Sequence, residues 1–235
     1  MQPHRRRSHV HGLHRRDHHR GVLRVCGEGR NSGSTMSKVS IWRGRDLRSG
    51  THVIHDDYPD FTGSDLRGQV ISTNDPWDPG SASITISGGR ATFSRADLRG
   101  TNMTSGWSQT SFVRANGAQT TWMNGPIQDC NFTAARLVES RWRGIHFKHC
   151  IFDEADLSRS LLVNVVFDTC ALRRSRLRRV ENPQQDGPDF TPLIFRGSDL
   201  AGSDFRGPRV TTLPSSSALP RRATFLGSNS RAPTF

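Results

Sequence analysis

Residues 130–157, CNFTAARLVESRWRGIHFKHCIFDEADL, carry a large apolar residue at almost every fifth position. A helix repeats about every 3.6 residues and a strand every two, so neither element alone explains a period of five. Steps of five from Phe112 to Leu177 pass fourteen positions, and all but Gly117 are large and apolar. The frame predicts a core made of Phe112, Trp122, Phe132, Leu137, Trp142, Phe147, Phe152, Leu157, Leu162, Phe167, Leu172 and Leu177.

The residue two places before each of these centres is mostly small, and three of these residues are cysteines. Cys130, Cys150 and Cys170 lie 20 residues apart. A redox or metal ladder is one interpretation. Parallel side chains stacked on neighbouring strands are, however, poorly aimed for a disulfide. We therefore interpret the three cysteines as compact apolar residues of the core.

The same phase continues outside the central stretch with interruptions. Earlier blocks are centred on Phe61 and Phe93, a fainter one on Trp42, and a last one runs from Phe190 to Phe205. Ten of the twelve phenylalanines fall on these centres. Recurrent words are Ala-Asp-Leu, Ser-Asp-Leu and Cys-Asn-Phe, as at residues 155–157, 64–66 and 130–132.

These words resemble the pentapeptide-repeat family, in which a small residue, Asp or Asn, Leu or Phe and two mostly polar residues recur. The resemblance covers residues 40–207 and is clearest over 91–179. It implies an all-β fold, a right-handed quadrilateral parallel β-helix with one pentapeptide on each side and 20 residues in each coil. The central residue of each pentapeptide and the small residue two places before it would both point inward.

A coil of 20 residues places side chains that are 20 apart on neighbouring strands, about 4.8 Å from each other. Outward charges then pair mostly with opposite sign, which stabilises such neighbours. The expected pairs are Arg136 and Arg176 with Asp156, Glu139 with Arg159, Asp153 with Arg173, Glu154 with Arg174, Lys148 with Asp168, and Asp129 with His149. Arg178 and Arg179 have no acidic partner in this frame, which makes them the candidate interaction surface.

The domain boundaries follow from the same frame. Residues 1–35 hold eight arginines and six histidines without apolar periodicity, so we expect a disordered basic leader, with Met36 resembling a native start. Alternatives are a nucleic-acid-binding arm or a metal tract. Residues 36–207 form the predicted β-helix, with Pro- and Gly-rich loops at 72–90 and 181–188, and residues 208–235 form an extended or disordered tail.

Composition and motifs argue against several function classes. No apolar run approaches the ~20 residues of a membrane span. His146 and His149 point away from Phe147 and Cys150 in the frame, so they do not form a zinc site, and we predict no metal or cofactor. There is no isolated acidic pair, nucleophile elbow or phosphate loop, so no catalytic residue is predicted. Four cysteines and no signal peptide favour a bacterial-type cytoplasmic protein.

The leading hypothesis is therefore a non-enzymatic scaffold that binds another macromolecule, a protein, with no feature indicating a homodimer. A branch of the resembled family mimics DNA and protects DNA gyrase through an acidic surface, which makes a topoisomerase modulator the second hypothesis. Residues 91–180 carry 13 basic and 7 acidic side chains, which does not fit that mimicry. Weak nucleic-acid binding through arginines is the third, carried by Arg173, Arg174, Arg176, Arg178 and Arg179.

Overall fold

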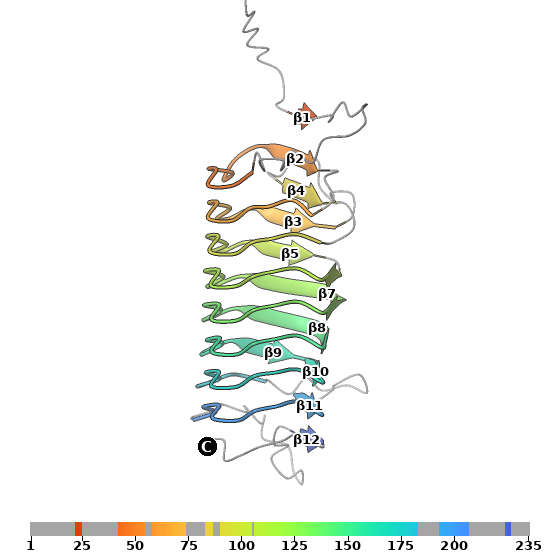
Figure 1. The fold of residues 1–235 in the computed structure, drawn as a ribbon, viewed down its shortest axis with the longest axis vertical. Coiled ribbons are helices and arrows are strands. Elements are labelled where there is room, and N and C mark those ends of the chain that lie inside the picture. Colours follow the sequence, from red (N-terminus) through yellow and green to blue (C-terminus); the bar gives the residue numbers. More distant parts are fainter. Residues whose placement is uncertain are drawn as a thin grey trace, which may run out of the picture.

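The fold is a right-handed parallel β-helix with four faces (Figure 1). The computed structural model describes residues 22–24, 42–54, 58–73, 83–86, 90–104, 106–182, 193–206 and 224–226. None of these residues is helical, and none therefore belongs to a helix that could cross a bilayer. We name the faces by the inward residue of coil 131–150: Phe132 on the first, Leu137 on the second, Trp142 on the third and Phe147 on the fourth.

The regular strands lie on the third and fourth faces, and neighbouring strands are parallel. Strands β7 (Thr121–Gln128) and β8 (Arg141–Lys148) run across both faces. The remaining strands are β1 (Val22–Arg24), β2 (Thr51–Ile54), β3 (Val70–Ser72), β4 (Ser83–Ile86), β5 (Asn102–Thr104), β6 (Trp107–Ser108), β9 (Leu161–Val163), β10 (Val166–Asp168), β11 (Ile194–Arg196) and β12 (Thr224–Leu226). The first and second faces pair through isolated bridges instead.

The register between coils is 20 residues through the centre of the solenoid. Asn116 pairs with Arg136, Arg136 with Asp156 and Asp156 with Arg176. The preceding pair, Asp97 with Asn116, is separated by only 19 residues. The cause is the four-residue step from Met103 to Trp107, which shortens one side of that coil while keeping both side chains buried.

Each corner of the coil needs one residue in the left-handed region of backbone space. It is the second residue after the centre, as at Ala134 (φ 55°), Glu139 (φ 59°) and His149 (φ 53°). Non-glycine residues pay a steric penalty there because Cβ approaches the neighbouring carbonyl. The ladder of hydrogen bonds between coils offsets this penalty: the amide of Glu139, for example, donates to the carbonyl of Ser158 at 3.0 Å.

The interior is filled by columns of stacked side chains. All of the predicted core residues from Phe112 to Leu177, and the three cysteines, are at most 2% exposed. On the first face, Phe112, Phe132 and Phe152 stack with centroids 4.7 and 4.6 Å apart and rings within 5° of parallel. On the third face, Trp122 lies 4.5 Å from Trp142. Such pairs add about 0.5–1.5 kcal/mol each to the free energy of burial.

The first interruption of the repeat contributes a strand of its own. Strand β4 lies within the predicted loop 72–90 and inserts between β2 and β3, so the sheet order is β2-β4-β3-β5 (Figure 1). It pairs with both neighbours, Ile84 with His52 and with Ile71. Because Ile84 and Ile86 are fully buried, the strand becomes part of the core.

The ends of the solenoid are described only in part. Strand β1 falls within the predicted leader and pairs in parallel with β2, while β12 falls within the predicted tail and pairs with β11. The remainder of residues 1–35 and 208–235, most of both predicted loops, and Phe190 lie outside the described residues.

Candidate interaction surface

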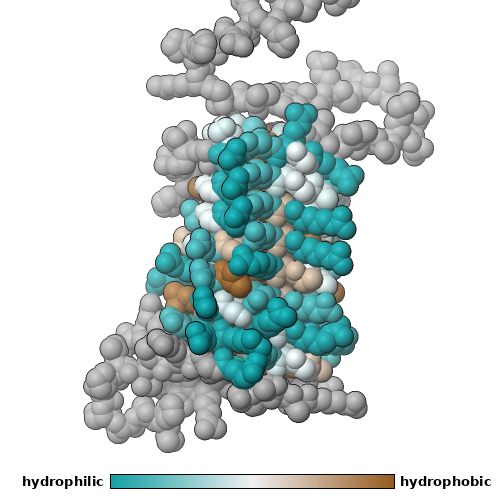
Figure 2. Space-filling model, turned by 90° about the vertical axis from the view of Figure 1, so that its left-hand side faces the viewer, coloured by the Kyte–Doolittle hydropathy of each residue, from teal (hydrophilic) through white to brown (hydrophobic). Residues whose placement is uncertain are grey.

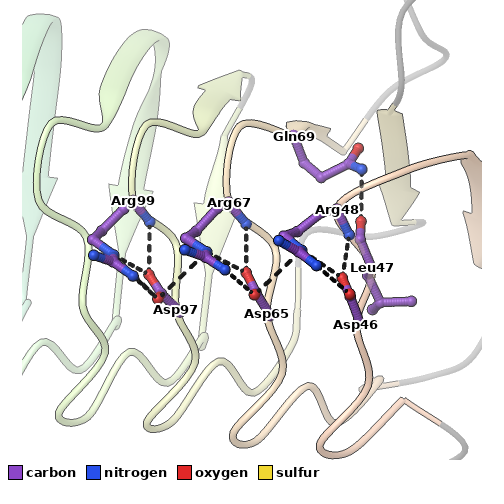
Figure 3. A network of polar contacts seen from close by, with 8 residues as sticks. All are labelled: Asp46, Leu47, Arg48, Asp65, Arg67, Gln69, Asp97 and Arg99. Atoms are coloured by element: carbon purple, nitrogen blue, oxygen red, sulfur yellow. Dashed lines mark hydrogen bonds and ion pairs between the residues drawn. The ribbon is translucent and has the colours of Figure 1, made fainter.

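The amino-terminal part of the second face carries a ladder of aspartates and arginines (Figure 3). The triplets 46–48, 65–67 and 97–99 each read Asp-Leu-Arg, and the buried leucine leaves its two charged neighbours outside. Each arginine binds the aspartate of its own triplet, with Nη2–Oδ2 distances of 2.7, 2.6 and 2.7 Å. The guanidinium groups also reach the next coil, Arg48 to Asp65 at 3.4 Å and Arg67 to Asp97 at 3.7 Å.

These contacts lower the pKa of the three aspartate carboxyl groups. The side-chain hydrogen bond from Arg48 lowers the pKa of Asp46 to about 2. The pKa of Asp65 is lowered chiefly by the hydrogen bond from Arg67. Partial burial acts in the opposite direction at Asp97, but the hydrogen bonds from Arg99 and the nearby positive charges outweigh it and lower its pKa. The ladder is therefore fully ionised at neutral pH, and its positive charges are already neutralised.

In the central coils four of the predicted 20-residue contacts are present. Three are ion pairs, with separations of 3.4 Å for Glu139–Arg159, 2.6 Å for Glu154–Arg174 and 3.8 Å for Asp156–Arg176, and His149 lies 3.5 Å from Asp129. All of these side chains are at least partly exposed, so each pair contributes little to the free energy of folding. Figure 2 shows one side of the solenoid, on which hydrophilic side chains are stacked in rows along the long axis.

The prediction that Arg178 has no acidic partner is wrong. Its Nε donates to Oδ2 of Asp204, which lies 26 residues further on. Asp204 is also bound by Arg206 at 2.8 Å, and these hydrogen bonds lower the pKa of Asp204. Beyond residue 182 the register is 28 instead of 20, as in the pairing of Arg176 with Asp204, so a 20-residue frame does not find this partner.

The predicted pair of Arg136 with Asp156 is wrong: the two residues are registered neighbours, but their side chains form no ion pair in the described structure. Two other predicted pairs are replaced by different contacts. The Arg173 guanidinium binds Asp199 at 2.7 Å, and only its backbone N–H donates to Asp153, at 2.9 Å. Lys148 is the registered neighbour of Asp168, but that carboxylate instead lies 3.5 Å from Nε2 of His146 and forms an ion pair with Arg196 at 3.8 Å. Most of the proposed arginine cluster 173–179 is thus neutralised by its neighbours.

Arg179 differs from Arg178, since it has no side-chain hydrogen bond or ion pair with any described residue. It shares this property with other cationic side chains elsewhere on the described solenoid, which lack such contacts: Arg95, Arg114, Arg136, Arg141, Arg143 and Lys148. Sequence reasoning overlooked Arg141 and Arg143. The signal was available, because the residues 20 positions before and after Arg141 are uncharged, Thr121 and Leu161.

Among the described residues, the three cysteines stack in one buried column, whereas His146 and His149 lie outside it, beside Asp168 and Asp129. Cys130, Cys150 and Cys170 are buried free thiols, and Sγ of Cys150 donates to the carbonyl of Ile127 at 3.3 Å. Hydrogen bonding with Cys150 and burial raise the pKa of the Cys130 and Cys170 thiols, which keeps both protonated. Among the described residues no group of three or more metal-ligating side chains comes together.

Comparison with known proteins identifies similar chains. Residues 130–168 match the model "Pentapeptide repeats" in eight copies. The chain is 32% identical over 86 residues to the pentapeptide repeat protein MfpA of Mycobacterium tuberculosis. That match covers 34% of this chain and 43% of MfpA, so it spans less than half of the relative's length.

Two solved structures show a weaker similarity. One is HetL, a pentapeptide repeat protein involved in heterocyst differentiation regulation in the cyanobacterium Nostoc: identity is 14%, TM-score 0.33, and 69% of this chain and 76% of HetL are covered. The other is QnrB1, a plasmid-mediated fluoroquinolone resistance protein: identity is 20%, TM-score 0.22, and coverage is 65% of this chain and 70% of QnrB1. With scores this low, the fold assignment rests on the register of the chain itself.

Proposed function

The chain belongs to the pentapeptide-repeat family, and we propose that it is a non-enzymatic cytoplasmic scaffold whose outer surface binds another protein. The observation that carries this proposal is the contrast between interior and exterior. Rings and leucines fill the coils, as with Phe132, Phe152 and Trp142 at 0% exposure, so a partner must bind outside. Solenoids bind partners through such extended regular surfaces.

The distribution of charge supports a protein partner over nucleic acid. Four of the five arginines between 173 and 179 hold carboxylates, through side-chain contacts with Asp199, Glu154, Asp156 and Asp204. Their positive charge is therefore largely unavailable to phosphate groups. Tight binding to single strands also uses exposed aromatic side chains, and the only large aromatic ring exposed among the described residues is Tyr58.

A topoisomerase is one candidate partner within this proposal, as the resemblance implies. The charge pattern argues against mimicry of DNA, because coil 131–150 carries four cationic side chains against Glu139 alone. A DNA mimic needs a continuous negative surface. A topoisomerase that binds this chain would therefore do so by contacts other than those of a duplex substitute.

The test is capture of partners by the full chain, followed by reconstitution with each purified candidate. We expect a stoichiometric complex with one protein that survives nuclease treatment and forms from purified components. Gyrase supercoiling assays with added chain examine the topoisomerase candidate separately. Retention that disappears with nuclease, or failure of every purified protein to bind, would overturn the proposal.

A further inference from the structure

The third face of the solenoid presents two arginines, Arg141 and Arg143, that have no counter-ion among the described residues. Arg141 and Arg143 lie at either side of Trp142 on β8, are exposed, and form no side-chain hydrogen bond or ion pair within the described chain. Trp142 is fully buried, stacks on Trp122, and donates from Nε1 to Oγ of Ser140 at 2.6 Å. This anchoring fixes the strand, and because side chains alternate along it, both guanidinium groups project to the same, outer side.

The surroundings of these arginines are uncharged. The registered neighbours of Arg141 are Thr121 and Leu161, and that of Arg143 on β7 is Met123. Met123 is 38% exposed and is one of three large apolar side chains exposed among the described residues. Two positive charges therefore share a flat sheet surface with an exposed thioether, and no carboxylate lies beside them on the adjoining strands.

We propose that Arg141, Arg143 and Met123, called here the β8 patch, bind an extended acidic segment of the partner protein. This inference rests on the proposed function, in which the partner is a protein. Residues two apart on a strand are separated by about 6.6 Å, so carboxylates two apart on an extended segment match the two arginines. Met and Arg are both enriched in protein–protein interfaces.

Nucleic acid fits the β8 patch less well. A phosphate backbone needs a continuing row of cations, whereas the strands on either side of β8 continue with Thr121 and Leu161 in the Arg141 column. On the third face the next coil contributes strand β9, Leu161–Val163, which carries no charged side chain. A long polyanion that followed this face would find no further cation there, while a short acidic segment needs only the two arginines.

The experiment measures fluorescence anisotropy of a labelled glutamate-rich peptide, a single-stranded oligonucleotide and a duplex with the full chain at physiological salt. We expect Arg141→Glu/Arg143→Glu to weaken peptide binding by about tenfold or more, since charge reversal opposes the ligand directly. The matched control, Arg114→Glu/Arg136→Glu, makes the same change in net charge at two other unpaired arginines and should alter binding less than about twofold.

Further variants test the contribution of each side chain. Met123→Ala should weaken binding of the peptide and leave binding of the oligonucleotides unchanged. Arg141→Gln/Arg143→Gln repeats the test without reversing the charges. An oligonucleotide that binds more tightly than the peptide, or an equal loss in the control, overturns the β8 patch. If a captured partner still binds the Arg141→Glu/Arg143→Glu chain, the patch is wrong and the scaffold stands. If the peptide binds and no protein partner reconstitutes, the scaffold proposal fails.

Discussion

The amino-terminal ladder and the β8 patch are built on the same coil geometry, yet they use arginine in opposite ways. In the ladder an aspartate precedes the buried leucine and an arginine follows it, as with Asp65 and Arg67, so the pair closes on itself at 2.6 Å. On β8, arginines occupy both of these outward positions around Trp142. On the same backbone, the identity of one residue decides whether a guanidinium forms an ion pair within the chain or remains available to a partner.

Both regions depend on the stacked core beneath them, so breaking the core should have the largest effect. Phe152→Asp places an unpaired charge against the stacked ring of Phe132, at a position with 0% exposure. We expect the protein to fail to fold, because an isolated buried charge costs more than the about 0.5–3 kcal/mol of an ordinary substitution.

The measurement for this prediction is soluble yield and circular dichroism. The control is Ile151→Asp, an adjacent outward residue with 40% exposure, which should remain folded. A stable Phe152→Asp protein would contradict the assigned inward frame.

Two glycines compare an inward position of the coil with an outward one beside the ladder. A Cβ on Gly117 would lie 2.9 Å from Cδ2 of the buried Leu137, whereas one on Gly100 would meet nothing within 4 Å. Gly117→Ala should therefore cost about 1–3 kcal/mol through overpacking. Gly100→Ala carries only the penalty of its φ of 67°, about 1 kcal/mol. Chemical denaturation measures both, and an equal loss would show that Leu137 moves aside without cost.

The stability that the ladder contributes should depend on acidic pH, whereas that of the β8 patch should not. The folded-state pKa of Asp46 is about 2, below the usual value near 3.9, and those of Asp65 and Asp97 are also lowered. A lowered carboxyl pKa contributes stability that is complete above the unfolded value and disappears as the pH falls toward the folded value. We expect the melting temperature to decline between about pH 5 and pH 2.

Asp46→Asn/Asp65→Asn/Asp97→Asn should flatten this part of the pH profile in thermal melts. The Arg141→Gln/Arg143→Gln chain should keep the slope of the unchanged protein, because no carboxylate is paired with either arginine among the described residues. If the three substitutions do not change the dependence of melting temperature on pH, the acid-sensitive groups lie outside the ladder.

The smallest effect is expected from neutralising the β8 patch itself. Arg141→Gln/Arg143→Gln removes no hydrogen bond or ion pair with the described chain, so the free energy of unfolding should change by less than about 0.5 kcal/mol. Arg67→Gln removes contacts with two aspartates and should lower the melting temperature more. Thermal and urea melts compare them, and a large loss in the β8 variant would indicate a structural role for these arginines.

Much of the candidate surface follows from the sequence where the repeat is unbroken. The period of five separates inward from outward residues, and the 20-residue coil then finds pairs such as Glu139–Arg159 and Glu154–Arg174. The frame fails after residue 182, where Arg178 binds Asp204 across an insertion. The sequence predicts a loop at 181–188, but not how many residues it adds to the coil, and that number decides which residues become neighbours.

The sequence by itself determined the pentapeptide frame, the core residues and the charge ladder of the central coils, because these depend on spacings within one coil and its neighbour. The tertiary structure alone decided that β4 enters the sheet between β2 and β3, and that Arg173 and Arg178 bind Asp199 and Asp204. These are contacts between segments whose separation is reset by insertions, so only the folded register brings them together.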